Sequence, residues 1–562
     1  MKIIKSLIRR SKFLSPILVL IIVFSLFSLS SCAQPSSTPV ASSSTPATEK
    51  IIRIDEDSIP RLDPAVGSDL SSATYFCNVY DSLVFPLRDG SIEPLLATKW
   101  EASDDGLTYT FYLRQGVKFH NGDELTAEDV VFSMKRLLTI GEGFAFLFKD
   151  VENVKALDSY SIQFTLKKPF GPFLQALCRL YILNEKQVMA NKKEGNYGEF
   201  GDYGRDWLLT HDAGSGPYML KEIKQAEYVL CEKFKDYWGG WDKFPDAPDF
   251  FKEIGTTEPV TIRTLMARGE LEITDPFQTK EALNALAQIP GVEIATIHSG
   301  SIGYVYLNTK KAPTDDIHFR KALAYCVDYD TLCTQIFPGY TPAKGPVASI
   351  TPGHNPNLFQ YKFDLTKAME ELKQSKYYGQ LDQYPVEFHW VSELPDNEKI
   401  ALMIQANAAK IGIKVNVVKV PWLTVTEELS KVETTPNAVT VSYMPNYADA
   451  GSVLERYHSR SCGTWIQGEW LQDPQIDAMI DDALATLDAK ERYQKYYEIQ
   501  EKIVDLCPSI FLFEKADRSA FRADSIIWPS WEEAKAGRPS NPVMGYDYYF
   551  REFKVLKKSP ST

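Results

Sequence analysis

The chain has 562 residues and a formal net charge of −13, and hydrophobic residues make up 44% of it. A chain of this length is too long for one hydrophobic core, so we expect two or more lobes. The acidic balance argues against nucleic acid and anionic lipid surfaces as partners of the folded body.

Residues 1–31 have the layout of a secretory signal peptide. An apolar run from Phe13 to Leu29 follows five cations, Lys2, Lys5, Arg9, Arg10 and Lys12. The run is too short to be interpreted first as a spanning helix. Small residues before Cys32 resemble the lipobox of bacterial lipoproteins, in which the Cys is diacylated and becomes the mature N-terminus. We expect lipidation at Cys32 and an extracytoplasmic location, in the periplasm or at the cell surface. An ordinary signal peptide, or an uncleaved anchor that contains a Cys, is the alternative.

Residues 32–50 consist mostly of Ser, Thr, Pro and Ala and show no apolar periodicity. Such a composition predicts a disordered linker, with a reach of about 20–25 Å. Ordered structure should begin near Ile51. Without the five cations of the leader, the remaining chain carries a charge of −18. No second long apolar run follows, so nothing else is expected to span a membrane.

Past the linker the sequence predicts mixed α/β structure. Strand patterns occupy Ile51–Ile54 and Tyr109–Leu113, the second of which alternates as a half-buried strand does. Capping residues predict the starts of three helices. The first begins at Thr126-Ala127-Glu128-Asp129, and Asp316 precedes the second. Asp488 opens the third, which should run to about Asp505, ahead of Pro508.

Seven cysteines remain after Cys32, and their spacing shows neither a CxxC pair nor a Cys/His zinc pattern. An odd number leaves at least one thiol free unless it pairs between chains. We expect most of them to be buried as small apolar residues. We expect no metal and no cofactor.

Several blocks of sequence resemble extracellular solute-binding proteins of the peptide/opine/nickel type (family 5, oligopeptide/dipeptide-binding-protein-like), which feed ABC importers. In chain order, the blocks span 62–64, 79–84, 94–101, 104–111, 113–122 and 126–130. Shorter matches follow at 214–218, 236–239, 307–309 and 320–323. The similarity covers essentially the whole mature chain.

The resemblance implies a two-lobed periplasmic-binding-protein-like α/β fold of the long, cluster C type. Each lobe then holds mixed sheets, and a hinge joins the lobes. Residues 51–305 would form lobe I with a family-specific extra subdomain, residues 306–512 lobe II, and residues 513–562 a return segment on lobe I. The crossings would lie near 301–307 and 509–513.

In peptide-binding relatives, a Trp followed three residues later by an Asp lies on the second lobe, and the Asp neutralises the ligand's ammonium group. Here Tyr443 stands in the place of the Trp and Asn446 in the place of the Asp. Asn can accept a hydrogen bond from an ammonium group but cannot balance its charge. Either Asp449 substitutes for the missing Asp, the ligand has no free amino terminus, or the alignment of this loop slips.

Other residues are candidates for ligand contact. The Gly-rich turn 214–216 lies at the cleft in the family, so Gly214, Ser215 and Gly216 are expected there, although a plain turn before a strand is the alternative. Some relatives bind oligosaccharides by stacking sugar rings on aromatic side chains. The aromatic candidates for such stacking are Tyr443, Tyr447, Trp390, Trp422, Trp465 and Trp470.

The resemblance implies a lipid-anchored, monomeric receptor that captures oligopeptides or dipeptides and delivers them to a membrane permease. An oligosaccharide-binding member of the same family is the alternative. An exported hydrolase is a remote one, since the sequence holds no HExxH, GxSxG or Walker motif. A nickel ligand is not expected, because no His or Cys cluster is apparent.

Overall fold

The computed structural model describes residues 48–56, 58–556 and 559–560. The predicted signal peptide, Cys32 and most of the predicted linker lie outside these residues. β1 (Thr48–Glu49) pairs with β20 (Ser559–Pro560), and the longer strand β2 (Ile51–Glu56) begins at the predicted position. Among the described helices, none is long and apolar enough to cross a membrane.

The first lobe is the set of elements around a large hydrophobic core that includes Ile52, Phe111 and Phe251. One of its sheets has the strand order β2-β11-β10-β9, with β2 parallel to β11 (Phe250–Gly255) and antiparallel pairs to β10 (Tyr228–Lys233) and β9 (Tyr218–Lys224). Its antiparallel sheet has the order β5-β6-β8-β7, formed by β5 (Ala97–Ala102), β6 (Thr108–Leu113), β8 (Ser161–Leu166) and β7 (Val151–Asp158). A hairpin joins β3 (Val84–Pro86) to β4 (Ile92–Pro94). The helices are α1 (Leu70–Val79), α2 (Ala127–Ile140), α3 (Phe173–Ala176), α4 (Glu185–Ala190) and α15 (Pro529–Lys535).

The second lobe surrounds a separate core that includes Tyr304, Phe388 and Ile503. Its six-stranded sheet has the order β13-β17-β12-β16-β14-β15, formed by β13 (Thr341–Pro342), β17 (Ser509–Arg522), β12 (Val292–Leu307), β16 (Ala438–Tyr443), β14 (Val386–Val391) and β15 (Val415–Val420). The helices are α7 (Ile317–Tyr325), α8 (Tyr329–Thr331), α9 (Leu365–Gln374), α10 (Asn397–Ala409), α11 (Trp422–Leu429), α12 (Gly451–Leu454), α13 (Pro474–Ala485) and α14 (Ala489–Leu506). Mixed sheets with helices in both lobes match the predicted α/β class.

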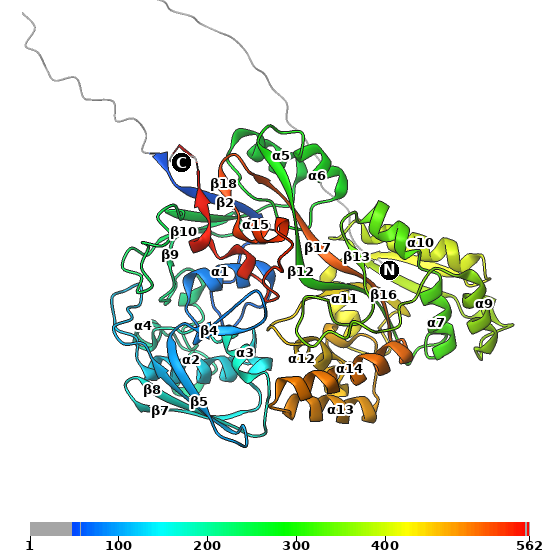
Figure 1. Cartoon of the computed structure of the whole chain (residues 1–562), viewed down its shortest axis with the longest axis horizontal. Coiled ribbons are helices and arrows are strands. Elements are labelled where there is room, and N and C mark those ends of the chain that lie inside the picture. The colour runs from blue at the N-terminus through cyan, green and yellow to red at the C-terminus, as the bar shows by residue number, and fades with distance from the viewer. Residues whose placement is uncertain (1–47, 57, 557–558, 561–562) are drawn as a thin grey trace, which may run out of the picture. The chain divides into compact units, whose positions relative to one another are not determined.

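Two long antiparallel strands, β12 and β17, run from one core into the other (Figure 1). On β12, Ala295 and Ile297 belong to the first core, whereas Ile302 and the residues after it belong to the second. The pairing is interrupted between His298 and Ile302, where Gly300 has a φ of 78°. The strand therefore passes between the cores at residues 298–302, slightly before the predicted crossing at 301–307.

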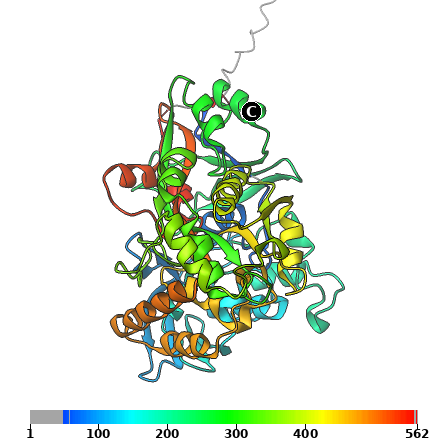
Figure 2. The ribbon, with the colours of Figure 1, turned by 90° about the vertical axis from the view of Figure 1, so that its right-hand side faces the viewer.

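Three further sets of residues pack around the two lobes. Helices α5 (Pro259–Arg268) and α6 (Lys280–Leu286) form a small third core with the far ends of β12 and β17. The return segment packs on the first core through Trp528, Tyr546 and Phe550. In both views the orange helices α13 and α14 lie next to the cyan part of the first lobe (Figures 1 and 2), where the backbone N–H of Gly171 donates to Leu484 O at 2.7 Å.

The predicted helix starts are confirmed. The Asp129 carboxylate accepts from the backbone N–H of Thr126 at 2.9 Å at the start of α2. Asp316 caps α7 through the N–H of Phe319, and Asp488 caps α14 through the N–H of Glu491, both at 2.9 Å. These side chains satisfy N–H groups that a helix leaves unpaired at its first turn.

The cysteine prediction is also confirmed. All seven described cysteines are free thiols, and all except Cys462 are buried. Burial raises the pKa of each of the six buried thiols. They are therefore protonated, apolar packing groups.

A buried ion pair joins three segments of the first lobe. Asp63 accepts two hydrogen bonds of 2.7 Å from the guanidinium of Arg136 on α2, and Arg136 Nε donates to Tyr203 O at 2.8 Å. Neither charged side chain is more than 6% exposed. Because the charges are withdrawn from water, each depends on its partner for compensation.

We predict that Asp63→Asn lowers the free energy of unfolding by about 3–5 kcal/mol, because it leaves the Arg136 charge buried without a counter-charge. Chemical denaturation measures this loss. Lys99→Ala, which breaks an exposed pair with Glu101, is the control and should change stability by no more than about 0.5 kcal/mol. Equal effects of the two substitutions would contradict the prediction.

Candidate ligand-binding site

The predicted binding loop begins at the end of β16. The run Ala-Val-Thr-Val-Ser-Tyr forms the strand, which pairs with β12 as far as Tyr443 opposite Ile302. Pro445 cannot donate to a ladder, and the chain leaves the sheet here. The following residues Tyr447 and Ala448 belong to the first core, although the strand before them belongs to the second. The loop therefore connects the two lobes.

Tyr443 and Asn446 contact each other. The amide Nδ2 of Asn446 donates to the hydroxyl of Tyr443 at 3.2 Å, and that hydroxyl donates to Ser452 O at 3.3 Å. Both residues are largely buried, with 8% and 9% exposure. No hydrogen bond from the described residues reaches Asn446 Oδ1, so this acceptor is available to a ligand.

Arg179 of the first lobe lies against this loop. Its Nε donates to the backbone O of Asn446 at 2.8 Å, Nη2 to Met544 O at 2.9 Å, and Nη1 to the Tyr181 hydroxyl at 3.3 Å. The guanidinium carbon is 4.8 Å from the ring centroid of Phe144. Sequence reasoning missed this residue, although one cation within the apolar run 173–183 is a signal that could have marked it.

Tyr447 and Asp449 are completely buried. The ring of Tyr447 packs edge-on against Phe170 at 6.1 Å, and its hydroxyl has no hydrogen-bond partner among the described residues. Asp449 Oδ2 accepts from Arg492 at 2.9 Å, and Asp449 Oδ1 from the N–H of Gly451 at 2.8 Å. Burial raises the pKa of Asp449 and the Arg492 charge opposes that rise. A ligand ammonium group could use this carboxylate only after the ion pair with Arg492 had opened.

The Gly-rich turn 214–216 lies inside the first lobe against the end of α1. A Cβ on Gly214 would meet the carbonyl O of Val79 at 2.0 Å, so only glycine fits there. Ser215 is fully buried, and its hydroxyl donates to Asp81 at 3.0 Å. Gly216 approaches the same stretch of backbone and accepts from His120 Nε2 at 3.0 Å. These contacts give the turn a packing role.

The candidate tryptophans divide into two groups. Trp390 is 4% exposed and belongs to the second core. Trp470 is tied by its indole N–H to the Thr435 hydroxyl at 2.9 Å. Trp465 packs against Tyr443 at 6.0 Å and therefore adjoins the predicted loop, and Trp422 packs against Trp465 at 5.2 Å.

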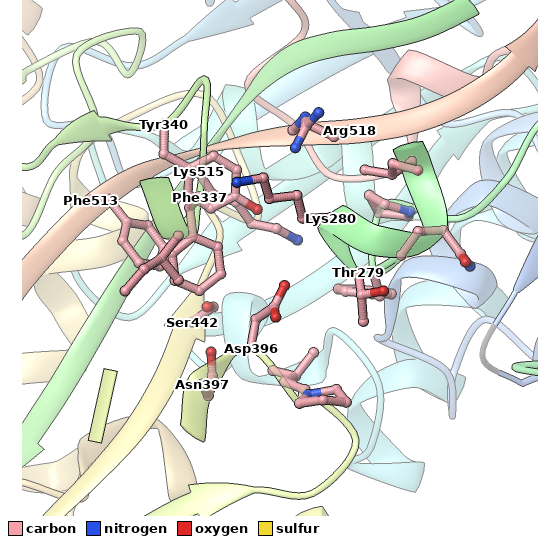
Figure 3. A pocket seen from close by; sticks show the side chains of 17 residues that line it. Thr279, Lys280, Phe337, Tyr340, Asp396, Asn397, Ser442, Phe513, Lys515 and Arg518 are labelled. Atoms are coloured by element: carbon pink, nitrogen blue, oxygen red, sulfur yellow. The ribbon is translucent and has the colours of Figure 1, made fainter. Parts of the chain in front are cut away.

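A cavity of about 90 Å³ lies beside the other end of the predicted loop (Figure 3). Segment 276–283, strand β17 and parts of the second lobe line it, including Ser442 directly before Tyr443. Its charged side chains are Lys280, Lys515, Arg518 and Asp396. Figure 3 shows the three cations on one side, opposite Asp396 and Ser442. This volume is well below the roughly 300–1,000 Å³ of typical small-molecule sites.

The partners of these charges differ. Lys515 pairs with Asp517 at 3.1 Å, and Asp396 pairs with Lys399 at 2.7 Å. Lys280 donates only to the carbonyl of Gln335, at 2.8 Å. Within the described part of the chain, the Arg518 guanidinium has no hydrogen bond and no ion pair. No group of three or more potential metal ligands occurs among the described residues.

The sequence profile described as "Bacterial extracellular solute-binding proteins, family 5 Middle" matches residues 91–464. The probable D,D-dipeptide-binding periplasmic protein of Escherichia coli K12 is 30% identical over 465 residues, which are 81% of this chain and 86% of the relative. The periplasmic binding protein DppA of Helicobacter pylori in complex with the peptide STSA aligns with a TM-score of 0.75 at 24% identity, over 91% of this chain and 99% of that one. AgaA from A. tumefacien R10 in complex with agropinic acid aligns with a TM-score of 0.73 at 21% identity, over the same shares of the two chains. These likenesses confirm the predicted fold.

Asp81, which accepts a hydrogen bond from Ser215 in the Gly-rich turn, should make the stability of the fold depend on pH. It accepts hydrogen bonds from Ser215, Tyr237 and Trp238 at 2.9–3.0 Å. Burial nevertheless raises the pKa of Asp81 from 3.8 to about 6. The folded state therefore holds the proton more tightly than the unfolded state does, and stability falls as the pH rises from about 4 to about 6.

We predict that Asp81→Asn removes this part of the pH dependence, worth about 3 kcal/mol across that interval. Denaturation of both proteins at several pH values should show the variant losing less stability than the wild type as the pH rises. Asp236→Asn, at an exposed position in the same region, is the control with no such change. A difference between wild type and Asp81→Asn that stays constant with pH would refute the prediction.

Proposed function

Since the chain belongs to the bacterial extracellular solute-binding proteins of family 5, we propose that it is the solute receptor of an ABC importer. In this proposal it captures a peptide or peptide-like solute between its two lobes. The family consists of binding proteins and not of enzymes, so capture involves no chemical step. The named relatives support a peptide-like solute, since one is a probable D,D-dipeptide-binding protein and another is in complex with a peptide.

One observation carries the proposed location of the site. The loop that begins at Tyr443 extends from the sheet of the second lobe into the first core, where Arg179 and Phe170 meet it. A solute bound at this loop would touch both lobes at once, and its contacts would favour the closed arrangement. Tyr443, Asn446 and Tyr447 are therefore the residues proposed to bind it, with Trp465 beside them.

The oligosaccharide alternative has less support. Trp390 is packed in the second core, and the indole N–H of Trp470 donates a hydrogen bond to Thr435. Trp422 and Trp465 meet edge-on at an interplanar angle of 74°. Stacking a sugar needs a free aromatic face, so this arrangement would have to change on binding.

We further propose that Cys32 carries the lipid anchor and that the segment up to Lys50 serves as the tether. A monomeric receptor held in this way remains close to the membrane permease that takes up its solute. The lipobox-like sequence around Cys32 supports this part of the proposal.

We predict that at least one peptide of two to five residues, with either a free or an acylated amino terminus, raises the melting temperature of the body from Lys50 onward. A ligand at 100 times its dissociation constant stabilises the folded state by about 2.7 kcal/mol. Tyr443→Ala should weaken binding without unfolding the protein, because it removes the partner of Asn446. Tyr378→Ala, at an exposed position of the second lobe, should leave binding unchanged. Stabilisation by oligosaccharides alone would favour the alternative, and equal affinity in Tyr443→Ala would remove this loop from the site.

We predict that Cys32→Ala moves the full-length protein from the membrane fraction to the soluble fraction of cells that export and lipidate it. The substitution removes the sulfur to which the lipid would be joined. Cys462→Ala is the matched control and should stay with the membrane. Immunoblots of the two fractions measure the distribution, and an unchanged distribution for Cys32→Ala would contradict the anchor.

A further inference from the structure

Arg179 is a buried cation without a counter-charge. It is 1% exposed, and its hydrogen bonds reach two backbone carbonyls and one tyrosine hydroxyl. No carboxylate of the described residues forms an ion pair with it. Burying a guanidinium in this way is costly, because carbonyl dipoles compensate only part of the lost hydration. The other fully buried arginines of the two lobes differ, since Arg136, Arg456 and Arg492 each pair with a carboxylate.

The position of this charge restricts the solute. Arg179 Nε donates to the carbonyl of Asn446, the residue that stands where peptide-binding relatives are expected to carry an Asp. The amide of Asn446 is neutral, and the nearby Asp449 is already neutralised by Arg492. An ammonium group placed at this loop would meet an unscreened positive charge in a medium of low dielectric constant. A carboxylate would instead supply the missing counter-charge.

Unused hydrogen-bonding groups at the same place fit this conclusion. A guanidinium has five N–H groups, and three bonds to the described residues leave two available. These two guanidinium N–H groups are donors suited to a carboxylate.

The other end of the loop is cationic as well. Ser442 lines the cavity in which Lys280 and Arg518 have no carboxylate partner. Ser442 and Asn446 are four residues apart, which an extended chain spans in at most about 14 Å. A short solute could therefore reach cations at both of its ends.

We propose that the solute is an anion without a free ammonium group, with one carboxylate received by Arg179 beside Asn446. This inference rests on the proposed function and specifies the class of solute for the same site. An acylated short peptide with a carboxylate at each end has the required chemistry. The cavity cations would then receive the second carboxylate.

Three probes of similar length test the charge. N-succinyl-Ala-Ala carries two carboxylates and no ammonium group, Ala-Ala-Ala carries one of each, and Ala-Ala-Ala-amide carries only the ammonium group. Calorimetry and thermal shift on the body from Lys50 onward should show the tightest binding for the succinyl probe and none for the amide. Binding of the amide or of Ala-Ala-Ala as tight as that of the succinyl probe would overturn the inference and leave the proposed function intact.

Asn446→Asp supplies a second measurement, with Asn446→Ala as its matched control. The new carboxylate would neutralise Arg179 from within, so affinity for the succinyl probe should fall at least tenfold relative to the wild type. Without any probe, Asn446→Asp should melt at a higher temperature than Asn446→Ala, since both lose the hydrogen bond to Tyr443 but only the first gains a counter-charge. A lower melting temperature for Asn446→Asp would refute the claim about Arg179. The two melting temperatures test the uncompensated charge of Arg179 even if no peptide, acyl peptide or saccharide binds. Absence of binding by all of these solutes would count against the proposed function itself.

Discussion

The antiparallel pairing of β12 with β17 is the constraint on which both lobes depend. These strands contribute Ala295, Ile297 and Phe521 to the first core, and Ile302 and Phe513 to the second. The register of this pair shifts between His298 and Ile302 and again between Gly303 and Tyr304, whereas the pairing before and after these residues is continuous. A change in the angle between the lobes would therefore be concentrated in a few residues around Gly300, as is usual for hinge motions.

The candidate loop is held by interactions that differ on its two sides. Toward α14, the pair between Asp449 and Arg492 is balanced in charge and satisfied in hydrogen bonds. Toward the first lobe, Arg179 contributes a charge that only dipoles oppose. The first side is suited to fix the backbone of the loop. On the second side the charge of Arg179 has no counter-charge, and a solute carboxylate could supply one. The Asp449–Arg492 pair is therefore suited to position the loop, and Arg179 to recognise the solute.

Features that depend on neighbouring residues in the chain were predicted well from the sequence. The caps at Asp316 and Asp488 need only the next turn of helix, and the alternation at Tyr109–Leu113 needs only one strand. The family was recognised from ordered blocks of this kind. The contact between Arg179 and Asn446 joins residues 267 positions apart, and no local pattern encodes it. For the same reason the sequence left Asp449 as a candidate for the ammonium group, whereas its partner Arg492 is apparent only once α14 has packed against the loop.

The unpaired cysteines have a consequence for how such a chain matures. Proteins of an extracellular family fold where oxidants are present, and a thiol reacts as the thiolate. In the folded state six thiols are buried and kept protonated by the raised pKa that burial causes, so they are protected as long as the cores stay closed. During folding they are exposed, and an incorrect disulfide formed then would be trapped away from reductants. The thiols are therefore most open to oxidation before the two cores close.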